Sequence, residues 1–154
     1  MLAVAAVQWW VSRDLVADSA PPLVGLTVTG APLQLVPGDR PTLVYFWAEW
    51  CPVCRFSEDA IDSIAEDHPV ITVATSSGTP DDVGAYLREQ GLAMPVLVDE
   101  SGALARAWGV NGVPAAFIID RNGVVAYKEV GFAPQMEGGM RATIEELLAA
   151  PVPE

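Results

Sequence analysis

The sequence contains few of the residues that usually bind nucleic acids or zinc. Its 154 residues include two cysteines, one histidine and eight basic residues against 20 acidic ones, which gives a formal net charge of −12. This argues against nucleic acid as a partner, because neutralising phosphate requires clustered lysine and arginine. A structural zinc ion needs four ligands, and His68 is the only histidine that could join the cysteines. We therefore expect no metal and no cofactor.

A long apolar run is also missing. Residues 1–11, MLAVAAVQWWV, are apolar but fall short of the roughly 20 residues that cross a bilayer. They lack the basic region and the cleavage site of a signal peptide. Because Trp9 and Trp10 end the run and tryptophan favours membrane interfaces, we expect the outer end of a membrane anchor. The alternative is a short amphipathic helix that packs on the domain.

The rest of the chain predicts one folded domain. Residues 12–22 are polar and end in two prolines, as linkers do. We therefore expect an anchor remnant plus linker over residues 1–21, a domain over 22–150 and a tail over 151–154. At 51% apolar residues, the chain can form a substantial core.

The order of apolar patterns predicts an α/β fold. Continuous apolar runs at 42–47 and 70–75 are typical of strands buried on both faces. The remaining strands are expected within 23–35 (two short strands around Gly30) and at 94–99, 115–120 and 124–130, and the helices at 52–67, 80–90, 101–109 and 135–149. Alternating strands and helices with a closing hairpin indicate a mixed central sheet flanked by helices.

Two of these helices have informative sequences. The helix at 80–90 has Thr79 as a capping residue, Pro80 at its first position and Gly91 after its end. In the helix at 52–67, apolar residues recur at helical spacing, and we expect them to face the core while acidic residues face solvent. The apolar set is Val53, Phe56, Ala60, Ile61 and Ile64, and the acidic set is Glu58, Asp59, Asp62 and Glu66.

The two cysteines, Cys51 and Cys54, lie between a predicted strand and a predicted helix, in WAEWCPVC. A purely structural disulfide would stabilise little, because it would close a loop of only two residues. A reactive dithiol is favoured, since backbone N–H groups at a helix N-terminus stabilise a thiolate and lower its pKa. We expect Cys51 to be the nucleophile and the more buried Cys54 to resolve the mixed disulfide.

A second stretch supports this interpretation. Val113 and Pro114 lie just before a predicted strand, where proline is tolerated. A cis Val113–Pro114 bond would expose the Val113 backbone, so that a substrate strand could pair with it beside the sulfurs.

These segments resemble the thioredoxin superfamily. YFWAEWCPVC is similar to its strand–active site–helix segment, and GVPAAFIIDRNG to its cis-proline segment and closing hairpin. The resemblance covers about residues 22–149 and implies a thioredoxin-like fold. An N-terminal β-hairpin and an inserted helix–strand unit at 79–102 resemble the membrane-anchored, extracytoplasmic TlpA/ResA group. Within it, WCPVCR after a short anchor is most similar to the suppressor-for-copper-sensitivity proteins of type D.

The resemblance also assigns candidate site residues. Cys51 and Cys54 match the redox pair, Pro114 the cis-proline, and Trp50 the tryptophan before the first cysteine. With Val113, Trp50 and Pro114 are expected to form the substrate groove.

Two positions depart from the family's carboxylates. Thioredoxin has a buried aspartate where this chain has Tyr45, and the ResA type has a glutamate where it has Ser57. Glu58 is then the nearest candidate acceptor for the proton of Cys54, with a solvated helix residue as the alternative. Pro52 and Val53, between the cysteines, are further candidates for tuning the thiol pKa.

The resulting expectation is an extracytoplasmic thiol–disulfide oxidoreductase, periplasmic and anchored to the inner membrane. Its clients would be proteins with disulfides or thiols, which it reduces or isomerises in copper stress or envelope disulfide homeostasis. A membrane thiol partner would keep it reduced. The alternatives are reduction of apocytochrome c and a non-catalytic binding or copper-binding module. Peroxidase activity is not expected, because the Thr-x-x-Cys arrangement of peroxiredoxins is absent.

Overall fold

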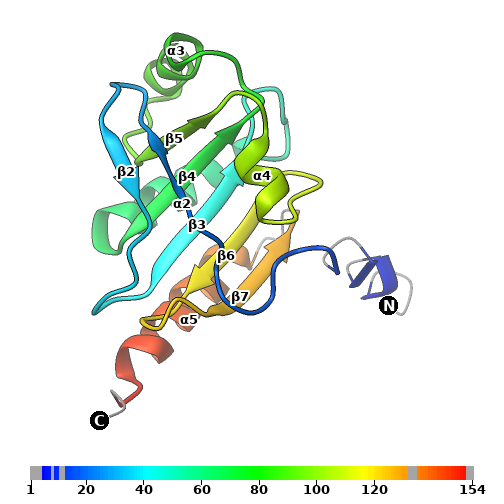
Figure 1. Cartoon of the computed structure of the whole chain (residues 1–154), viewed down its shortest axis with the longest axis vertical. Helices are drawn as coiled ribbons and strands as arrows, with labels where there is room; N and C mark the ends of the chain where they lie inside the picture. The colour runs from blue at the N-terminus through cyan, green and yellow to red at the C-terminus, as the bar shows by residue number, and fades with distance from the viewer. Residues whose placement is uncertain (1–4, 8, 11–12, 132–134, 152–154) are drawn as a thin grey trace.

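The computed structural model describes residues 5–7, 9–10, 13–131 and 135–151, and a five-stranded mixed sheet lies at its centre (Figure 1). The spatial order is β5-β4-β3-β6-β7, with β3, β4 and β5 parallel and β6 and β7 antiparallel to their neighbours. The strands are β3 (Thr42–Trp47), β4 (Val70–Thr75), β5 (Val96–Asp99), β6 (Ala115–Ile119) and β7 (Val125–Val130). The expected order of strands and helices is confirmed.

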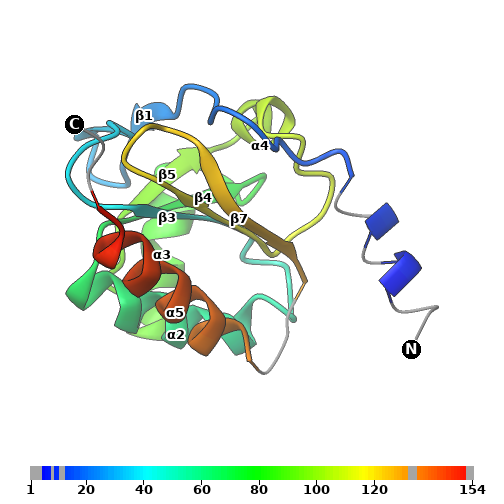
Figure 2. The same ribbon diagram turned by 90° about the horizontal axis from the view of Figure 1, so that it is seen from below.

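Layers cover both faces of the sheet (Figure 2). On one face pack α2 (Arg55–Asp67), α3 (Pro80–Gln90) and α5 (Met136–Ala149). The other face carries α4 (Ala103–Ala107) and the small hairpin of β1 (Val24–Leu26) and β2 (Pro32–Gln34). The chain therefore folds as the α/β architecture that its sequence predicts, with the hairpin in front and the α3–β5 unit inserted.

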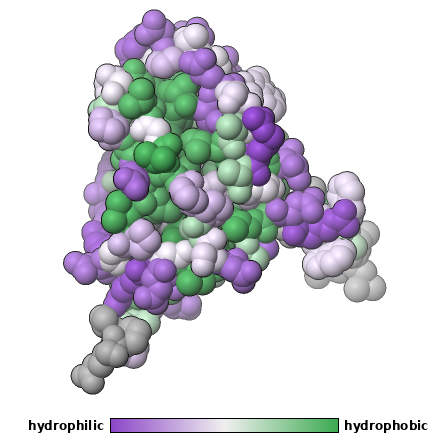
Figure 3. All heavy atoms as spheres, viewed as in Figure 1, coloured by the Kyte–Doolittle hydropathy of each residue, from purple (hydrophilic) through white to green (hydrophobic). Residues whose placement is uncertain are grey.

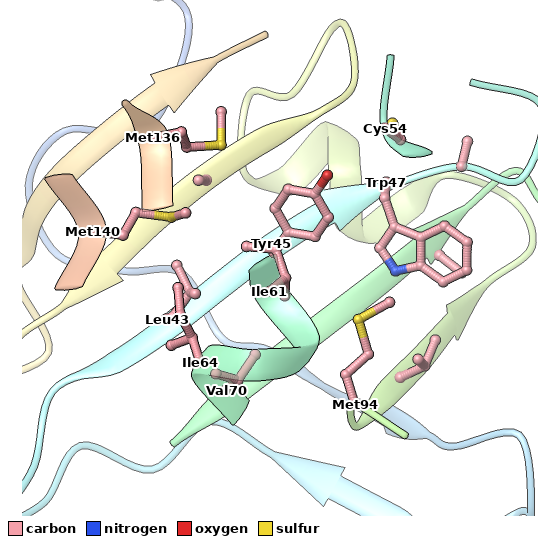
Figure 4. Packing of buried hydrophobic residues seen from close by; sticks show 14 of the residues in the cluster. Leu43, Tyr45, Trp47, Cys54, Ile61, Ile64, Val70, Met94, Met136 and Met140 are labelled. Atoms are coloured by element: carbon pink, nitrogen blue, oxygen red, sulfur yellow. The ribbon is translucent and has the colours of Figure 1, made fainter. Parts of the chain in front are cut away.

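The central strand β3 divides the core in two, because successive side chains of a strand point to opposite faces. Leu43, Tyr45 and Trp47 face the three helices, and Figure 4 shows the first two beside Ile61 of α2 and Met140 of α5. The intervening residues, Val44 and Phe46, face α4, where Phe46, Trp108 and Phe117 form a cluster of aromatic rings. All six residues of β3 are buried, so its C-terminal end is held firmly at the edge where the cysteines follow.

Helix α2 differs from the sequence prediction in two ways. Residues 52–54 form a turn, so the helix begins at Arg55 with Cys54 as its N-cap rather than at Pro52. Its buried face is also rotated from the predicted one. Phe56 is 71% exposed, while Glu58 is 3% exposed. The buried face is the one that continues from Cys54 in steps of three or four residues. It consists of Ser57, Glu58, Ile61 and Ile64 and packs on the sheet.

Helix α3 begins and ends as its sequence predicts. The Thr79 hydroxyl accepts a hydrogen bond from the amide of Asp82, whose carboxylate accepts one from the Thr79 amide, so the two form a capping box. Gly91 ends the helix at φ 67°, in the left-handed region. These caps fix the length of the unit that connects β4 to β5.

The segment before β1 is tied to the domain. Leu15 is buried in the core next to Trp108, and the amide of Val16 donates to the Trp108 carbonyl. Ser19 forms an isolated bridge with Val124 of the closing hairpin. The polar composition that marks residues 12–22 as a linker therefore does not prevent residues 13–20 from packing across the sheet.

The expected anchor falls partly outside the described residues. Residues 5–7 and 9–10 are helical, and Val7, Trp9 and Trp10 are exposed, whereas residues 1–4, 8 and 11–12 are among those not described. In the described part of the chain, every helix is too short or too polar to span a bilayer. The anchor and the limits drawn at residues 21 and 150 therefore stay predictions.

The face seen in Figure 1 carries an apolar area. Figure 3 shows apolar residues gathered where β1 and the sheet lie in Figure 1, with polar residues around them. In and after the β1–β2 hairpin, Val24, Leu26 and Val36 have exposed side chains.

Candidate active site

The two cysteines lie where the central strand turns into α2. β3 ends at Trp47, three residues separate it from Cys51, and Cys54 is the N-cap of the helix. Cys51 and Cys54 form a disulfide. Cys51 is 5% exposed and Cys54 0%, so the difference in accessibility has the direction expected for a nucleophile and a resolving cysteine.

Backbone groups surround the sulfur of Cys51. The amide of Cys54 lies 3.2 Å from Cys51 Sγ and points its N–H at it. An N–H group aimed at this sulfur at the start of a helix favours a negative charge on it, so it would stabilise the Cys51 thiolate in the reduced protein. The geometry therefore suits Cys51, rather than Cys54, to attack a disulfide.

The loop before β6 lies against the same sulfur. The Val113–Pro114 peptide bond is cis, as the sequence predicts. The carbonyl oxygen of Val113 is 3.7 Å from Cys51 Sγ. Among the described residues, the Val113 amide has no hydrogen-bond partner, although β6 begins only two residues later. A polar group left unpaired next to a reactive sulfur is available to a bound chain.

Apolar side chains are exposed around the pair. Trp50 is 61% exposed, and its indole N–H donates to the carbonyl of Ser76 at 3.0 Å, which fixes the ring beside Cys51. Val53 and Phe56, on the turn and the first turn of α2, are also exposed. The rotation of α2 that buries Glu58 thus places Phe56 on the surface near the sulfurs, where a client chain can contact it.

Tyr45 and Ser57 contact each other behind Cys54. The Tyr45 hydroxyl hydrogen-bonds to Ser57 Oγ, and Ser57 Oγ donates to the Cys54 carbonyl at 3.0 Å. Figure 4 shows the Tyr45 hydroxyl pointing to the side on which Cys54 lies. Burial raises the pKa of Tyr45 well above its ordinary value, so its hydroxyl stays protonated and is not a proton acceptor at neutral pH. Two neutral groups therefore occupy the positions where the family resemblance implies carboxylates.

Glu58 supplies a buried carboxylate on the same helix. Burial raises its pKa above the ordinary range, and hydrogen bonds from the Tyr86 hydroxyl and the nearby charge of Arg55 act in the opposite direction. Both carboxylate oxygens of Glu58 lie 2.9 Å from the Tyr86 hydroxyl, and burial together with Glu58 raises the pKa of Tyr86 to about 12. Glu58 is therefore not the solvated helix residue that the sequence left as an alternative.

Tyr86 and Arg55 were not found from the sequence. Tyr86 belongs to α3, its ring lies 5.4 Å from that of Trp47, and the Arg55 guanidinium lies 6.0 Å from its centroid. Only the packing of α3 against α2 brings these groups together, and no local pattern signals it. Within the described residues, no cluster of three or more His, Cys, Asp or Glu side chains is arranged to hold a metal ion.

Comparison with known proteins agrees with this geometry. The model of the AhpC/TSA family matches residues 16–128, which include both cysteines and Pro114. The thiol:disulfide interchange protein HelX of Rhodobacter capsulatus is 30% identical over 138 residues, covering 86% of this chain and 77% of HelX. A thioredoxin-like protein of Haemophilus influenzae is 34% identical over 90 residues, covering 58% of this chain and 54% of the relative.

Solved structures share the fold. A Chlorobium tepidum protein assigned as a thiol:disulfide interchange protein DsbE superposes with a TM-score of 0.76 at 29% identity, covering 86% of this chain and 97% of that one. The alignments span about half the length of several curated relatives, including the Haemophilus protein.

Proposed function

The chain belongs to the AhpC/TSA family, and we propose that it is a thiol–disulfide oxidoreductase that exchanges disulfides with client proteins through Cys51 and Cys54. The observation that carries the proposal is the position of the pair at the start of α2, with Cys51 Sγ facing both the Cys54 amide and the Val113 carbonyl. The names of the relatives, which are thiol:disulfide interchange proteins, support it.

The proposed reaction moves two electrons from the dithiol to a client disulfide. The Cys51 thiolate attacks one client sulfur, a mixed disulfide forms, and the other client sulfur leaves as a thiolate. The Cys54 thiolate then attacks Cys51 Sγ, which re-forms the Cys51–Cys54 disulfide and releases the second client thiolate. The two protons of the original dithiol end on the two client sulfurs. A dithiol reductant must restore the reduced protein.

Val113, Pro114 and Trp50 are proposed as the client-binding groove. The Val113 carbonyl lies against Cys51 Sγ, and the Val113 amide has no hydrogen-bond partner among the described residues, so an extended client segment can pair with them as an added strand. The exposed ring of Trp50 forms the wall next to Cys51.

Four residues are proposed to set the pKa values of the thiols. Pro52 and Val53 shape the turn between the cysteines, and Pro52 has no N–H to offer a thiolate. Glu58 is proposed as the group that accepts the proton of Cys54 through the buried interior. Tyr45 acts as a neutral hydrogen-bonding group behind Cys54.

The proposed setting is the periplasm, with residues 1–21 linking the domain to the inner membrane and a membrane thiol protein as electron donor. The exposed Trp9 and Trp10 at the end of the apolar run support the membrane association. Reduction or isomerisation of a few client disulfides, in copper stress or envelope disulfide homeostasis, is the proposed task.

Reduction of insulin disulfides by dithiothreitol, with the protein as catalyst, tests the central proposal. Cys51→Ser is expected to lower the catalysed rate to the uncatalysed level, because Cys54, the other cysteine, is fully buried and cannot reach a client disulfide. Cys54→Ser is expected to accumulate a covalent mixed disulfide with insulin, detected by mass spectrometry, because the resolving thiol is gone.

A binding measurement separates this proposal from a groove that binds without exchange. If Cys51→Ser keeps the full wild-type rate, the oxidoreductase proposal is wrong. A non-catalytic binder would show equal peptide affinity in wild type and Cys51→Ser and no catalysed reduction by either protein.

A further inference from the structure

A surface pocket opens beside the redox pair. Its volume is about 210 Å³, and it lies between Trp50, the residues after β4, α4 and the loop that leads to Val113. Trp50 and Val113 belong both to the pocket and to the surroundings of Cys51, whose Sγ is 3.7 Å from the Val113 carbonyl. Any chain bound at Val113 therefore reaches the mouth of the pocket.

One charged residue, Arg106 of α4, lines the pocket. Its Nη1 donates to the carbonyl of Ser101 at 2.8 Å, which holds the guanidinium in the pocket wall. The same nitrogen packs over Gly102, where a Cβ atom would come within 3.3 Å of it and within 3.2 Å of Ser76 Oγ. A guanidinium has five N–H donors, so most of its donors stay open to a ligand.

No acidic residue lines the pocket with Arg106. The buried Asp99 lies at the base of α4, but its carboxylate already accepts from the Thr75 hydroxyl and from the amides of Leu104 and Ala105. Among the described ion pairs, none involves Arg106. In a chain with a net charge of −12, this is a localised positive site in a pocket that shares Trp50 and Val113 with the surroundings of Cys51.

We propose that the pocket receives an acidic side chain of the client, from a residue within two positions of the client cysteine. This inference rests on the proposed function, because it takes the client to be bound at Val113. Extended chains advance about 3.3 Å per residue and alternate their side chains, so a residue one or two positions away reaches from the sulfur into an adjoining pocket.

The remaining walls fit such a side chain. Trp50, Ala105 and Val110 offer apolar contact to its methylene groups, and Asn111 and Ser76 lie on the same lining. The Trp50 indole is held in place by its hydrogen bond to the Ser76 carbonyl, so the wall is formed before the client binds.

Disulfide-bonded peptides that differ at one position test this. Each peptide carries Glu, Gln or Lys at a single position, one or two residues before or after the client cysteine. The value of kcat/KM for reduction is measured at low salt. Wild type is expected to reduce the Glu peptide at least about threefold faster than the Lys peptide at one of these positions, as one partly exposed ion pair predicts. The preference should shrink in about 0.5 M salt.

Variants identify the residue responsible. Arg106→Gln should abolish the preference for Glu over Lys, and Arg106→Glu should reverse it. Arg88→Gln, which removes an exposed arginine of α3 away from the pocket, is the matched control and should keep the wild-type preference. Equal rates for Glu and Lys peptides at every position in wild type overturn the pocket proposal, and so does an Arg106→Gln protein that keeps the preference.

Binding of the same peptides to Cys51→Ser, followed by fluorescence polarisation, separates the two proposals. Selective binding of the Glu peptide without any reduction by wild type would overturn the oxidoreductase function and retain the pocket. Reduction of all peptides without any selectivity in rate or binding would retain the function and overturn the pocket.

Discussion

Glu58 shows how a single side chain connects the stability of the protein to its redox site. It lies on the face of α2 that also carries Cys54, and it is buried against α3, where the Tyr86 hydroxyl contacts both of its oxygens. Because burial raises its pKa, the folded protein binds this proton more tightly than the unfolded chain does. The neutral form of Glu58 therefore stabilises the fold.

The pH dependence of unfolding should reveal this. The stabilisation from Glu58 is complete below the pKa of the unfolded chain and is lost as pH rises through the higher pKa of the folded protein. In urea unfolding, the free energy of unfolding of wild type should decline from about pH 4 to about pH 8. Glu58→Gln should lack part of this decline. Parallel declines in the two proteins would contradict the raised pKa.

Two tyrosine variants provide matched controls. Tyr86→Phe removes the hydrogen bond that lowers the pKa of Glu58, so the decline should extend to higher pH. Tyr45→Phe also removes one buried hydroxyl, but its partner is Ser57, so the decline should resemble that of wild type. If Glu58 also accepts the Cys54 proton, Glu58→Gln alters the pH dependence of mixed-disulfide resolution as well as that of stability.

Individual residues limit what the sequence could reveal about the site. Cys51 and Cys54 were predicted as site residues from their spacing before a helix, and Pro114 from its place at the start of a strand together with the cysteine motif. Tyr86 and Arg106 were not, since each approaches the site only after α3 and α4 pack on the sheet. Glu58 was identified as a candidate, but its burial was not, because Phe56 looked like the better core residue.

At the level of elements, prediction was accurate where local signals are strong. The capping box at Thr79 and the apolar runs of β3 and β4 gave the bounds of α3 and both strands as observed. The start of α2 was predicted three residues early, because the turn between the cysteines has no signal that distinguishes it from a first helical turn. The predicted buried face of α2 was wrong, because the spacing of apolar residues does not show which of them, here Phe56, is exposed.

The polar composition of the segment before β1 does not indicate that this segment packs on the domain. Gly109 offers a test of the packing. Gly109 has φ 68°, and a Cβ atom there would overlap the Asp14 carbonyl. Gly109→Ala should therefore lower the free energy of unfolding by about 2 kcal/mol or more, from backbone strain plus displacement of the segment. Urea unfolding measures the loss, and limited proteolysis should show faster cleavage within residues 13–20.

Gly91→Ala is the control for that variant. Gly91 has nearly the same φ, 67°, but a Cβ atom there meets nothing within 4 Å. Only the strain of alanine in the left-handed region remains, which costs about 1 kcal/mol. Equal losses for the two variants, with unchanged proteolysis, would show that residues 13–20 do not depend on the contact at Gly109.

For the whole molecule, folding thermodynamics bears on the direction in which electrons flow through the cysteine pair. The disulfide closes a loop of only two residues, so its direct effect on the unfolded chain is small. A difference in the free energy of unfolding between the oxidised and reduced proteins therefore measures mainly whether the folded site stabilises the disulfide or the dithiol. A strong oxidant is one whose reduced form is the more stable.

The site predicts a protein more stable when oxidised. The Cys54 amide favours a thiolate at Cys51, but both cysteines are buried, which disfavours charge. Within the described residues, no basic side chain hydrogen-bonds to the Cys51 sulfur to offset that burial. We therefore expect a higher unfolding midpoint for the oxidised form and a potential below about −200 mV, measured by equilibration with glutathione, as a reductant requires. A value near about −120 mV, with the reduced form more stable, would reverse the proposed direction.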